Sequence, residues 1–435
     1  MIYTLYSITD WVFVGRLGGD AVAALSFTVP LVFFALGVTF GLGTGATSVI
    51  ARFLGADDKP QADNAARHAI LIGLAVAVLI VAGALFFKYE ILTLLGTSGE
   101  VRELAVVYFE IIALSFVFGI LNVSFRSIMT GEGNTRTPVM IQASGTVLNI
   151  ILDPILIFWA KLGIAGAAWA TFASQLIVFA IFIYYIFVRR GSYLDLRFTH
   201  FSFDRKLVFG ILSVGIPASA AMLIMSTGSM FFNRIISVFG NEAVAGFGIG
   251  GRLDAIYFMP TFAIATSQVT LAGMFLGAGR IDLIRQTLIY SILRAEVIAV
   301  LVGVVFYIFA PVICPWFTDD QAIVGVAVSY IRIIVFVFPF VTIGVVSGRT
   351  FQGLGSGLPS LFLTSLRVII IAVPLALFFT RGLGYGLTSV WASFVISGAV
   401  SSTIAICWLS LRLRRLEAER VSHEVGGDLP AGATA

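Results

Sequence analysis

Long apolar segments separated by short polar joints dominate this chain. They fall roughly at residues 1–15, 23–49, 67–87, 103–125, 138–159, 163–187, 207–233, 243–275, 283–310, 322–348, 359–379 and 385–411. A helix needs roughly 20 apolar residues to cross about 30 Å of hydrocarbon. The pattern predicts an all-α polytopic membrane protein with about 12 transmembrane helices. The first segment is too short to cross a bilayer alone, and its Asp10 and lack of a basic start argue against a signal peptide.

The two halves of the chain resemble each other. GGDAVAAL at 18–25 matches GNEAVAGF at 240–247, and TGEGNTRTP at 130–138 matches QGLGSGLP at 352–359. Each pair starts 222 residues apart (18 to 240, 130 to 352). Matches that share one register across half a chain indicate an internal repeat. We therefore expect two six-helix lobes that are parallel repeats about a pseudo-twofold axis along the membrane normal, with a cavity between them.

The longest polar joint, RRGSYLDLRFTHFSFDRK at 189–206, separates the two sets of six segments. Basic residues gather in this joint and in alternate joints along the chain, which places both termini in the cytoplasm by the positive-inside rule. The polar tail after about 415 is expected to be disordered. The sequence predicts an amino-terminal lobe at 1–188 with a truncated first helix, a cytoplasmic linker at 189–206, a carboxy-terminal lobe at 207–411 and a cytoplasmic tail at 412–435.

Composition supports a membrane protein and argues against several other classes. Hydrophobic residues make up 59% of the chain and charged residues 11%, whereas soluble proteins are about one quarter charged. Cys314 and Cys407 lie in apolar runs without metal spacing, and no cluster of nucleophile and base emerges, so we expect no enzyme activity. GLGTG at 41–45 lacks the Lys-Ser/Thr of a phosphate loop, so ATP is not the expected energy source. The small basic excess reflects loop topology rather than nucleic-acid binding.

Two carboxylates within apolar segments are the strongest candidates for chemistry. A charge at membrane depth costs roughly 2.5–3.5 kcal/mol on insertion scales, so such residues usually have a function. Asp10 lies in the first segment and Asp153 in the middle of the fifth. Asn149, four residues before Asp153, shares its helix face. Pro154 should free the carbonyl of residue 150 and kink this helix near Asp153.

Two carboxylates in one dry cavity would not both stay ionised, so Asp10 and Asp153 could load a proton as a pair. With oxygens from Asn149 and a nearby hydroxyl, the same cluster could instead hold Na⁺. The residues alone do not separate these two ions.

Other polar residues within apolar segments have weaker claims. Tyr108 and Glu110 lie early in the fourth segment, and Asn122 could line a cavity. Arg252 and Asp254 are expected to form a local ion pair, of the kind that makes membrane-embedded charges tolerable. Glu296 is expected to pair with Arg294 or with a lipid headgroup.

Several long motifs, in order and over nearly the whole chain, resemble the multidrug and toxic compound extrusion (MATE) family, within the MOP flippase superfamily. They are ITDWVFVGRLGGDAVAAL, GATSVIARFLGADDKPQADNAARHA, FRSIMTGEGNTRTPVMIQASGTVLNIILDPILIF, GIAGAAWATFASQ, GRLDAIYFMP and FLGAGR. The resemblance implies twelve helices in two lobes, and export of amphipathic, often cationic, drugs and dyes by H⁺ or Na⁺ antiport.

The resemblance also implies a cation site in the amino-terminal lobe. Its aspartate, Asn–Asp pair and threonine fall on Asp10, Asn149, Asp153 and Thr171 of this sequence. If the coupling ion is Na⁺, these four residues are the expected metal ligands. A cavity tyrosine of the family falls on Tyr108, which together with Asn122 is assigned to the substrate cavity.

Two departures from the family pattern matter. The resemblance implies further residues upstream of Met1, including a proline, so we expect a truncated first helix. The seventh segment lacks the acidic residue of the NorM-like branch, so the chain resembles the DinF-like branch, in which the amino-terminal lobe carries the coupling. Asp254 is then the remaining mid-segment acid that could form a second-lobe site.

The sequence thus predicts a secondary multidrug antiporter of the cytoplasmic (inner) membrane that works by alternating access as a monomer, with H⁺ or Na⁺ and no other cofactor. Small-molecule drugs and dyes and the lipid bilayer are the expected partners, and nucleic acid is not. The alternative is a lipid-linked oligosaccharide flippase of the same superfamily. A flippase needs a strongly cationic central cavity for a pyrophosphate, for which the sequence offers Arg234, Arg252, Arg332 and Arg367.

Overall fold

The computed structural model describes residues 11–427, which form helices joined by short turns, without a β-strand in that range. Ten of these helices are long and apolar enough to cross a membrane, and a bent pair of helices provides an eleventh span. The predicted first segment lies mostly at residues 1–10, outside the described part of the chain, and so does Asp10; residues 11–15 are helical. The prediction of an all-α polytopic membrane protein is confirmed.

The chain divides into two compact units, residues 1–54 with 58–219 and residues 55–57 with 220–435. The helices that precede the division are α2 (Gly19–Gly55), α3 (Lys59–Phe86), α4 (Lys88–Leu94), α5 (Gly99–Gly131), α6 (Arg136–Pro154), α7 (Gly163–Ile183) and the first part of α8 (Arg205–Ile236). The helices that follow it are the rest of α8, α9 (Asn241–Gly277), α10 (Ile281–Ile313), α11 (Gln321–Ile334), α12 (Phe338–Gly353), α13 (Leu358–Ser365), α14 (Val373–Leu377) and α15 (Thr388–Gly427).

The internal repeat extends to the ends of the helices. Helices α2 and α9 each have 37 residues, and they begin at 19 and 241 and end at 55 and 277, which is the 222-residue offset of the sequence. Left-handed backbone recurs in the joints at the same offset. The matching residues and their φ angles are Gly18 (117°) and Gly240 (106°), Asp57 (58°) and Gly279 (68°), and Gly133 (91°) and Gly355 (84°). The glycine-rich joints therefore repeat as backbone conformation, which explains why glycine is kept there.

The repeat is broken at one helix. In the first half α5 is continuous, whereas the equivalent stretch of the second half is divided into α11 and α12, which are bent by 58° at residues 335–337. The predicted span at 322–348 is therefore a bent one. Pro339, the second residue of α12, has no N–H for the carbonyl of Val335, so the helical ladder is interrupted there. Val117 occupies the matching position of α5, which keeps its ladder.

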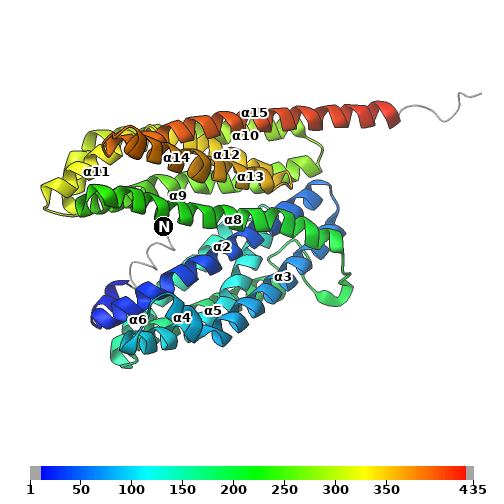
Figure 1. Ribbon diagram of the computed structural model, residues 1–435. Coiled ribbons are helices and arrows are strands. Elements are labelled where there is room, and N and C mark those ends of the chain that lie inside the picture. The colour runs from blue at the N-terminus through cyan, green and yellow to red at the C-terminus, as the bar shows by residue number, and fades with distance from the viewer. Residues whose placement is uncertain (1–10, 428–435) are drawn as a thin grey trace, which may run out of the picture. The chain divides into compact units, whose positions relative to one another are not determined.

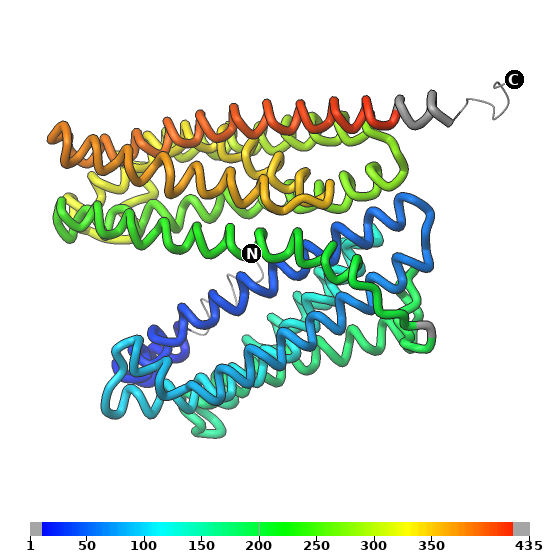
Figure 2. The backbone as a smooth tube through the Cα atoms, turned by 45° about the vertical axis from the view of Figure 1, so that its right-hand side comes forward, coloured from blue at the N-terminus to red at the C-terminus, as the bar shows by residue number. Residues whose placement is uncertain are grey.

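Within the amino-terminal unit, α5 packs against both α3 and α7, and α6 packs against α7 (Figures 1 and 2). The linker joins this packing through side chains of α3. Asn64 donates to the Ser202 carbonyl at 2.8 Å, and His68 Nε2 accepts the N–H of Asp204 at 3.0 Å. These bonds tie residues 202–204 to α3, so the second half of the linker is an ordered part of this unit.

Within the carboxy-terminal unit, α9 packs against α10, α11 and α12, and α12 packs against α15 (Figure 1). Helix α15, orange to red in Figure 1, continues to Gly427. The expectation of disorder after about residue 415 was therefore wrong for residues 416–427. The reason is that this stretch carries strong helix formers such as Leu, Arg, Glu and Ala without a proline or glycine before 426.

Candidate functional site

Asn149 and Asp153 lie together on one face of α6, as their spacing predicts. Both side chains are fully buried, and Asn149 Nδ2 donates to Asp153 Oδ1 at 3.3 Å. The Asn149 Oδ1 atom is buried without a hydrogen-bond partner among residues 11–427. A buried amide oxygen beside a carboxylate is a pair of hard oxygen ligands, of the type that a small cation prefers. The pair therefore fits either Na⁺ or a proton held between polar groups.

The backbone changes character directly after this pair. The α-helical part of α6 ends at Pro154, and Ile155–Trp159 form a π-helical turn closed by Ala160 N–H to the Ile155 carbonyl at 2.8 Å. Single π-helical turns are frequent at functional sites because they leave carbonyl groups free and re-aim side chains. The helix thus changes type directly after Pro154, and the predicted kink near Asp153 stays a prediction.

The other predicted residues of this lobe are buried on neighbouring helices. Thr171 lies on α7, which packs against α6 and its π-helical turn, and is 6% exposed. Tyr108 lies on α5, which packs against α7, and is 4% exposed. These positions are compatible with the assigned cation and cavity roles, which stay predictions.

Asn122 has a different environment. It is 1% exposed, and its Nδ2 donates to the Gln175 carbonyl at 3.0 Å and to Gln175 Oε1 at 2.9 Å, which joins α5 to α7. Asn122 is fourteen residues after Tyr108, or about 21 Å along the helix at about 1.5 Å per residue. The structure therefore does not bring the two predicted cavity residues together. Sequence reasoning missed Gln175, which lies one helical turn after Thr171.

The expected local ion pairs are absent from the described residues. Arg252 is exposed, and Asp254 bonds to a different residue. The Arg294 guanidinium lies over the Tyr290 ring at 5.1 Å rather than beside Glu296. The two intrahelical ion pairs were wrong because helical neighbours two residues apart do not face each other, and the lipid headgroup as a partner of Glu296 stays a prediction. Glu110, for which no partner was predicted, forms an ion pair with Lys88 at the start of α4.

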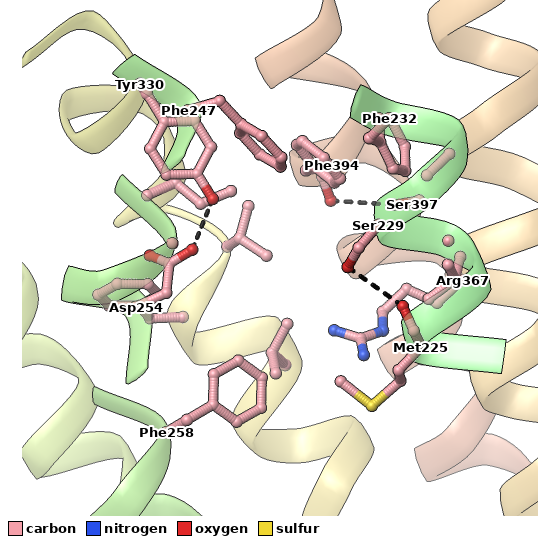
Figure 3. Close-up of a pocket in the computed structure, with 18 of the residues that line it drawn as sticks. Met225, Ser229, Phe232, Phe247, Asp254, Phe258, Tyr330, Arg367, Phe394 and Ser397 are labelled. Carbon is pink, nitrogen blue, oxygen red and sulfur yellow. Dashed lines mark hydrogen bonds between the residues drawn. The ribbon is translucent and has the colours of Figure 1, made fainter. Parts of the chain in front are cut away.

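The carboxy-terminal unit contains a cavity of about 240 Å³ (Figure 3). Its walls come from α8, α9, α11, α12, α15 and the π-helical segment Leu366–Ala372 that follows α13. Aromatic and polar side chains line this space. They include Phe232, Phe247, Asp254, Phe258, Tyr330, Arg367 and Phe394.

Asp254 and Tyr330 form the polar group on one side of the cavity. Tyr330 Oη donates to Asp254 Oδ2 at 2.5 Å. The Tyr330 ring is held edge-on against Trp391, with centroids 4.9 Å apart, and Trp391 is fully buried. The carboxylate is thus held in one orientation by a tyrosine whose own position is set by packing. Tyr330 was not singled out in the sequence, although it lies 222 residues after Tyr108, the offset of the repeat.

Arg367 lies on the other side of the cavity and points into it (Figure 3). It is half-buried, and it forms neither an ion pair nor a hydrogen bond with any described residue. The other three arginines that a flippase would use, Arg234, Arg252 and Arg332, are exposed and do not line this cavity. This cavity of the carboxy-terminal unit therefore holds one arginine opposite one carboxylate.

The match to a protein family gives the context for these sites. The family model MatE matches residues 1–155 and 217–378, which is most of the chain. This chain belongs to the MatE family. Members of the family are membrane transporters and not enzymes. The MATE resemblance seen in the sequence is confirmed.

Relatives within the family align over most of both sequences. The "Probable multidrug resistance protein NorM" of Thermotoga maritima is 26% identical over 93% of this chain and 88% of its own length. The "Multidrug export protein MepA" of Staphylococcus saprophyticus is 28% identical over 97% and 92%. An "FAD transporter" of Shewanella oneidensis is 25% identical over 85% and 83%.

Solved structures of MatE-type transporters share the fold of this chain. A MOP superfamily transporter from Pyrococcus furiosus superposes with a TM-score of 0.90 at 30% identity, over 96% of this chain and 93% of that one. An outward-facing MATE transporter gives a TM-score of 0.91 at the same identity and coverage. The agreement covers both lobes, so this chain is a multi-pass membrane transporter of that fold.

Proposed function

We propose that this protein is a secondary active antiporter that exports amphipathic organic compounds, cationic drugs and dyes among them, in exchange for H⁺ or Na⁺. The observation that carries the proposal is the fully buried Asn149–Asp153 pair in a chain of the MatE family. The names of relatives, two of which refer to multidrug resistance or export and one to FAD, support an organic cargo. We place the protein in the cytoplasmic membrane as a monomer, with both termini in the cytoplasm.

The chemistry follows from the cost of burying charge. An ionised Asp153 inside an apolar lobe is unfavourable, and binding of a cation neutralises it. We assign Asp153 and Asn149 as the primary ligands, with Thr171 and Asp10 completing the site. A cation that binds one conformation of the lobe better than the other shifts the equilibrium by the ratio of its two affinities. Cargo that favours the opposite conformation is then coupled to the cation, and the coupling is reciprocal.

The proposal is tested by dye transport in vesicles that contain the purified full chain. Ethidium movement is measured under an imposed proton gradient and then under an imposed sodium gradient. We expect one of the two gradients to drive transport, and Asp153→Asn to abolish the gradient-driven part at equal protein content. Glu103→Gln removes an exposed carboxylate of the same lobe and should leave transport unchanged. Undiminished gradient-driven transport by Asp153→Asn would rule out Asp153 as the coupling residue.

The flippase alternative is not favoured, because the names of two relatives that align over most of this chain refer to multidrug resistance or export. In the cavity of the carboxy-terminal unit, a lipid pyrophosphate, which carries several negative charges, would also meet Asp254. If a lipid pyrophosphate bound more tightly than a cationic dye to the purified protein, the assignment of organic cargo would be wrong.

A further inference from the structure

The cavity of the carboxy-terminal unit is a second candidate site, separate from the Asn149–Asp153 pair, and its polar groups are not alike. The Asp254 carboxylate already accepts the Tyr330 hydroxyl at 2.5 Å. The Arg367 guanidinium, on the other side, has no charged or hydrogen-bonded partner among the residues that the structure describes. A guanidinium offers five donors in a fixed plane, which match a carboxylate or sulfonate. The cavity therefore has a place for an anion beside Arg367.

The backbone places Arg367 in this position by two local features. Leu366–Ala372 are π-helical, which rotates this segment relative to a continuous α-helix and is a feature common at binding sites. The facing helix α8 carries Gly228 at the contact, where a Cβ atom would lie 2.1 Å from Val368 Cγ1. The missing side chain lets the segment approach α8 directly beside Arg367. The π-helical segment and the contact at Gly228 therefore place the backbone of Arg367 beside the cavity.

The remaining walls fit an aromatic body. Phe232, Phe247, Phe258 and Phe394 surround the space between the two charged groups (Figure 3). Aromatic rings pack favourably edge-on or offset against such side chains. A volume of about 240 Å³ lies just below the about 300–1,000 Å³ of pockets for drug-sized ligands. The space therefore takes a small ligand, or one ring system of a larger one.

We propose that this cavity binds an aromatic organic anion, whose single anionic group pairs with Arg367 while its ring packs among the phenylalanines. Asp254 faces the same space and disfavours a second negative charge, so monoanions and zwitterions bind better than dianions. The proposal extends the cargo range beyond cationic compounds. It rests on the proposed function only in that the bound anion is a cargo, because the binding itself requires no transport.

Binding of three probes of nearly equal shape tests the proposal: 2-naphthoate, neutral 2-naphthamide and cationic 2-naphthylmethylamine. Each is titrated calorimetrically into the purified full chain. We expect 2-naphthoate to bind about ten-fold or more tightly than the amide, as charge-assisted hydrogen bonds predict. Arg367→Gln should remove that preference, and Arg367→Lys should restore part of it because the charge is kept but the planar fork is lost. Arg332→Gln is the matched control, since Arg332 is exposed on the same lobe and lies outside the cavity.

Three results would overturn the proposal. The first is equal binding of the naphthoate and the amide by the natural protein, and the second is an unchanged preference in a folded Arg367→Gln variant. The third is tighter binding of the amine than of the naphthoate, because the cavity would then select cations through Asp254. Asp153→Asn should bind 2-naphthoate normally while it loses gradient-driven transport. A failure of the proposed anion site can therefore be distinguished from a failure of the proposed antiport.

Discussion

Tyr330 Oη lies 2.5 Å from Asp254 Oδ2, and the Tyr330 ring packs against Gly250, one helical turn before that aspartate. A Cβ atom on Gly250 would lie 2.1 Å from Tyr330 Cδ1. The bond between α9 and α11 thus depends on a residue that has no side chain. Tyr330 also occupies the repeat position of Tyr108, so both lobes place a buried tyrosine at this point of the repeat, and in the second lobe it binds a carboxylate.

The first prediction concerns Gly250. Gly250→Ala should push the Tyr330 ring away and weaken its bond to Asp254, at a cost of about 1–3 kcal/mol for an overpacked site. The measurement is the thermal unfolding midpoint of the purified protein. Gly248→Ala is the control, because nothing lies within 4 Å of a Cβ atom at that position of the same helix. Equal midpoints for the two variants would show that the ring has room to move.

The second prediction concerns the bend between α11 and α12. Tyr257 is fully buried, and its Oη donates to the Phe338 carbonyl at 2.6 Å in the first turn of α12. Thr342 Oγ1 lies 2.6 Å from the same hydroxyl. Tyr257→Phe removes the hydroxyl, so the Phe338 carbonyl and the Thr342 hydroxyl stay buried without this hydrogen-bond partner. We therefore expect a loss of about 1–3 kcal/mol in the free energy of unfolding.

Tyr307→Phe is the matched control for Tyr257, because Tyr307 is 45% exposed and its hydroxyl makes no hydrogen bond to a described residue. Urea or thermal unfolding of both variants in detergent gives the comparison. A Tyr257→Phe variant as stable as Tyr307→Phe would mean that the hydroxyl contributes nothing to the bend.

The third prediction concerns pH and the linker. Glu132, just after α5, accepts hydrogen bonds from the Ser192 hydroxyl and from the N–H groups of Tyr193 (3.2 Å) and Leu194 (3.3 Å). Burial raises the pKa of the Glu132 carboxyl above its usual range, although these three donors act against the rise. An acid whose pKa rises on folding stabilises the fold fully below its ordinary pKa, and that contribution is lost as the pH rises through the raised value.

Glu132→Gln cannot ionise, and its amide oxygen still accepts an N–H of the linker. We therefore expect the stability of the natural protein, relative to Glu132→Gln, to be greatest at pH about 4 and to fall toward pH about 7. Unfolding midpoints across this range measure the difference. Glu90→Gln, at an exposed glutamate of the same unit, should show no such trend. If the stability of the natural protein relative to Glu132→Gln grew with pH, the direction assigned to the pKa shift of Glu132 would be wrong.

Much of the fold was readable in the sequence because both of its main determinants are local. Apolar length decides which segments cross a membrane, and glycine in the joints decides where the backbone becomes left-handed. The repeat offset gave the equivalent helices, and the spacing of Asn149 and Asp153 placed them on one face. Family resemblance added Thr171, which spacing alone did not indicate.

Contacts between helices could be decided only by the tertiary structure. Arg252 looked like the partner of Asp254 because it is near in sequence, yet Tyr330, 76 residues away, binds it. Asn122 looked like a cavity residue, yet it joins α5 to Gln175 of α7. A residue's partner depends on which helix faces it and how closely the backbones approach, and the sequence of one helix contains neither. The sequence by itself therefore determined the helices, their repeat and the buried acid of the first lobe, whereas packing determined which arginine and which tyrosine share the cavity of the second.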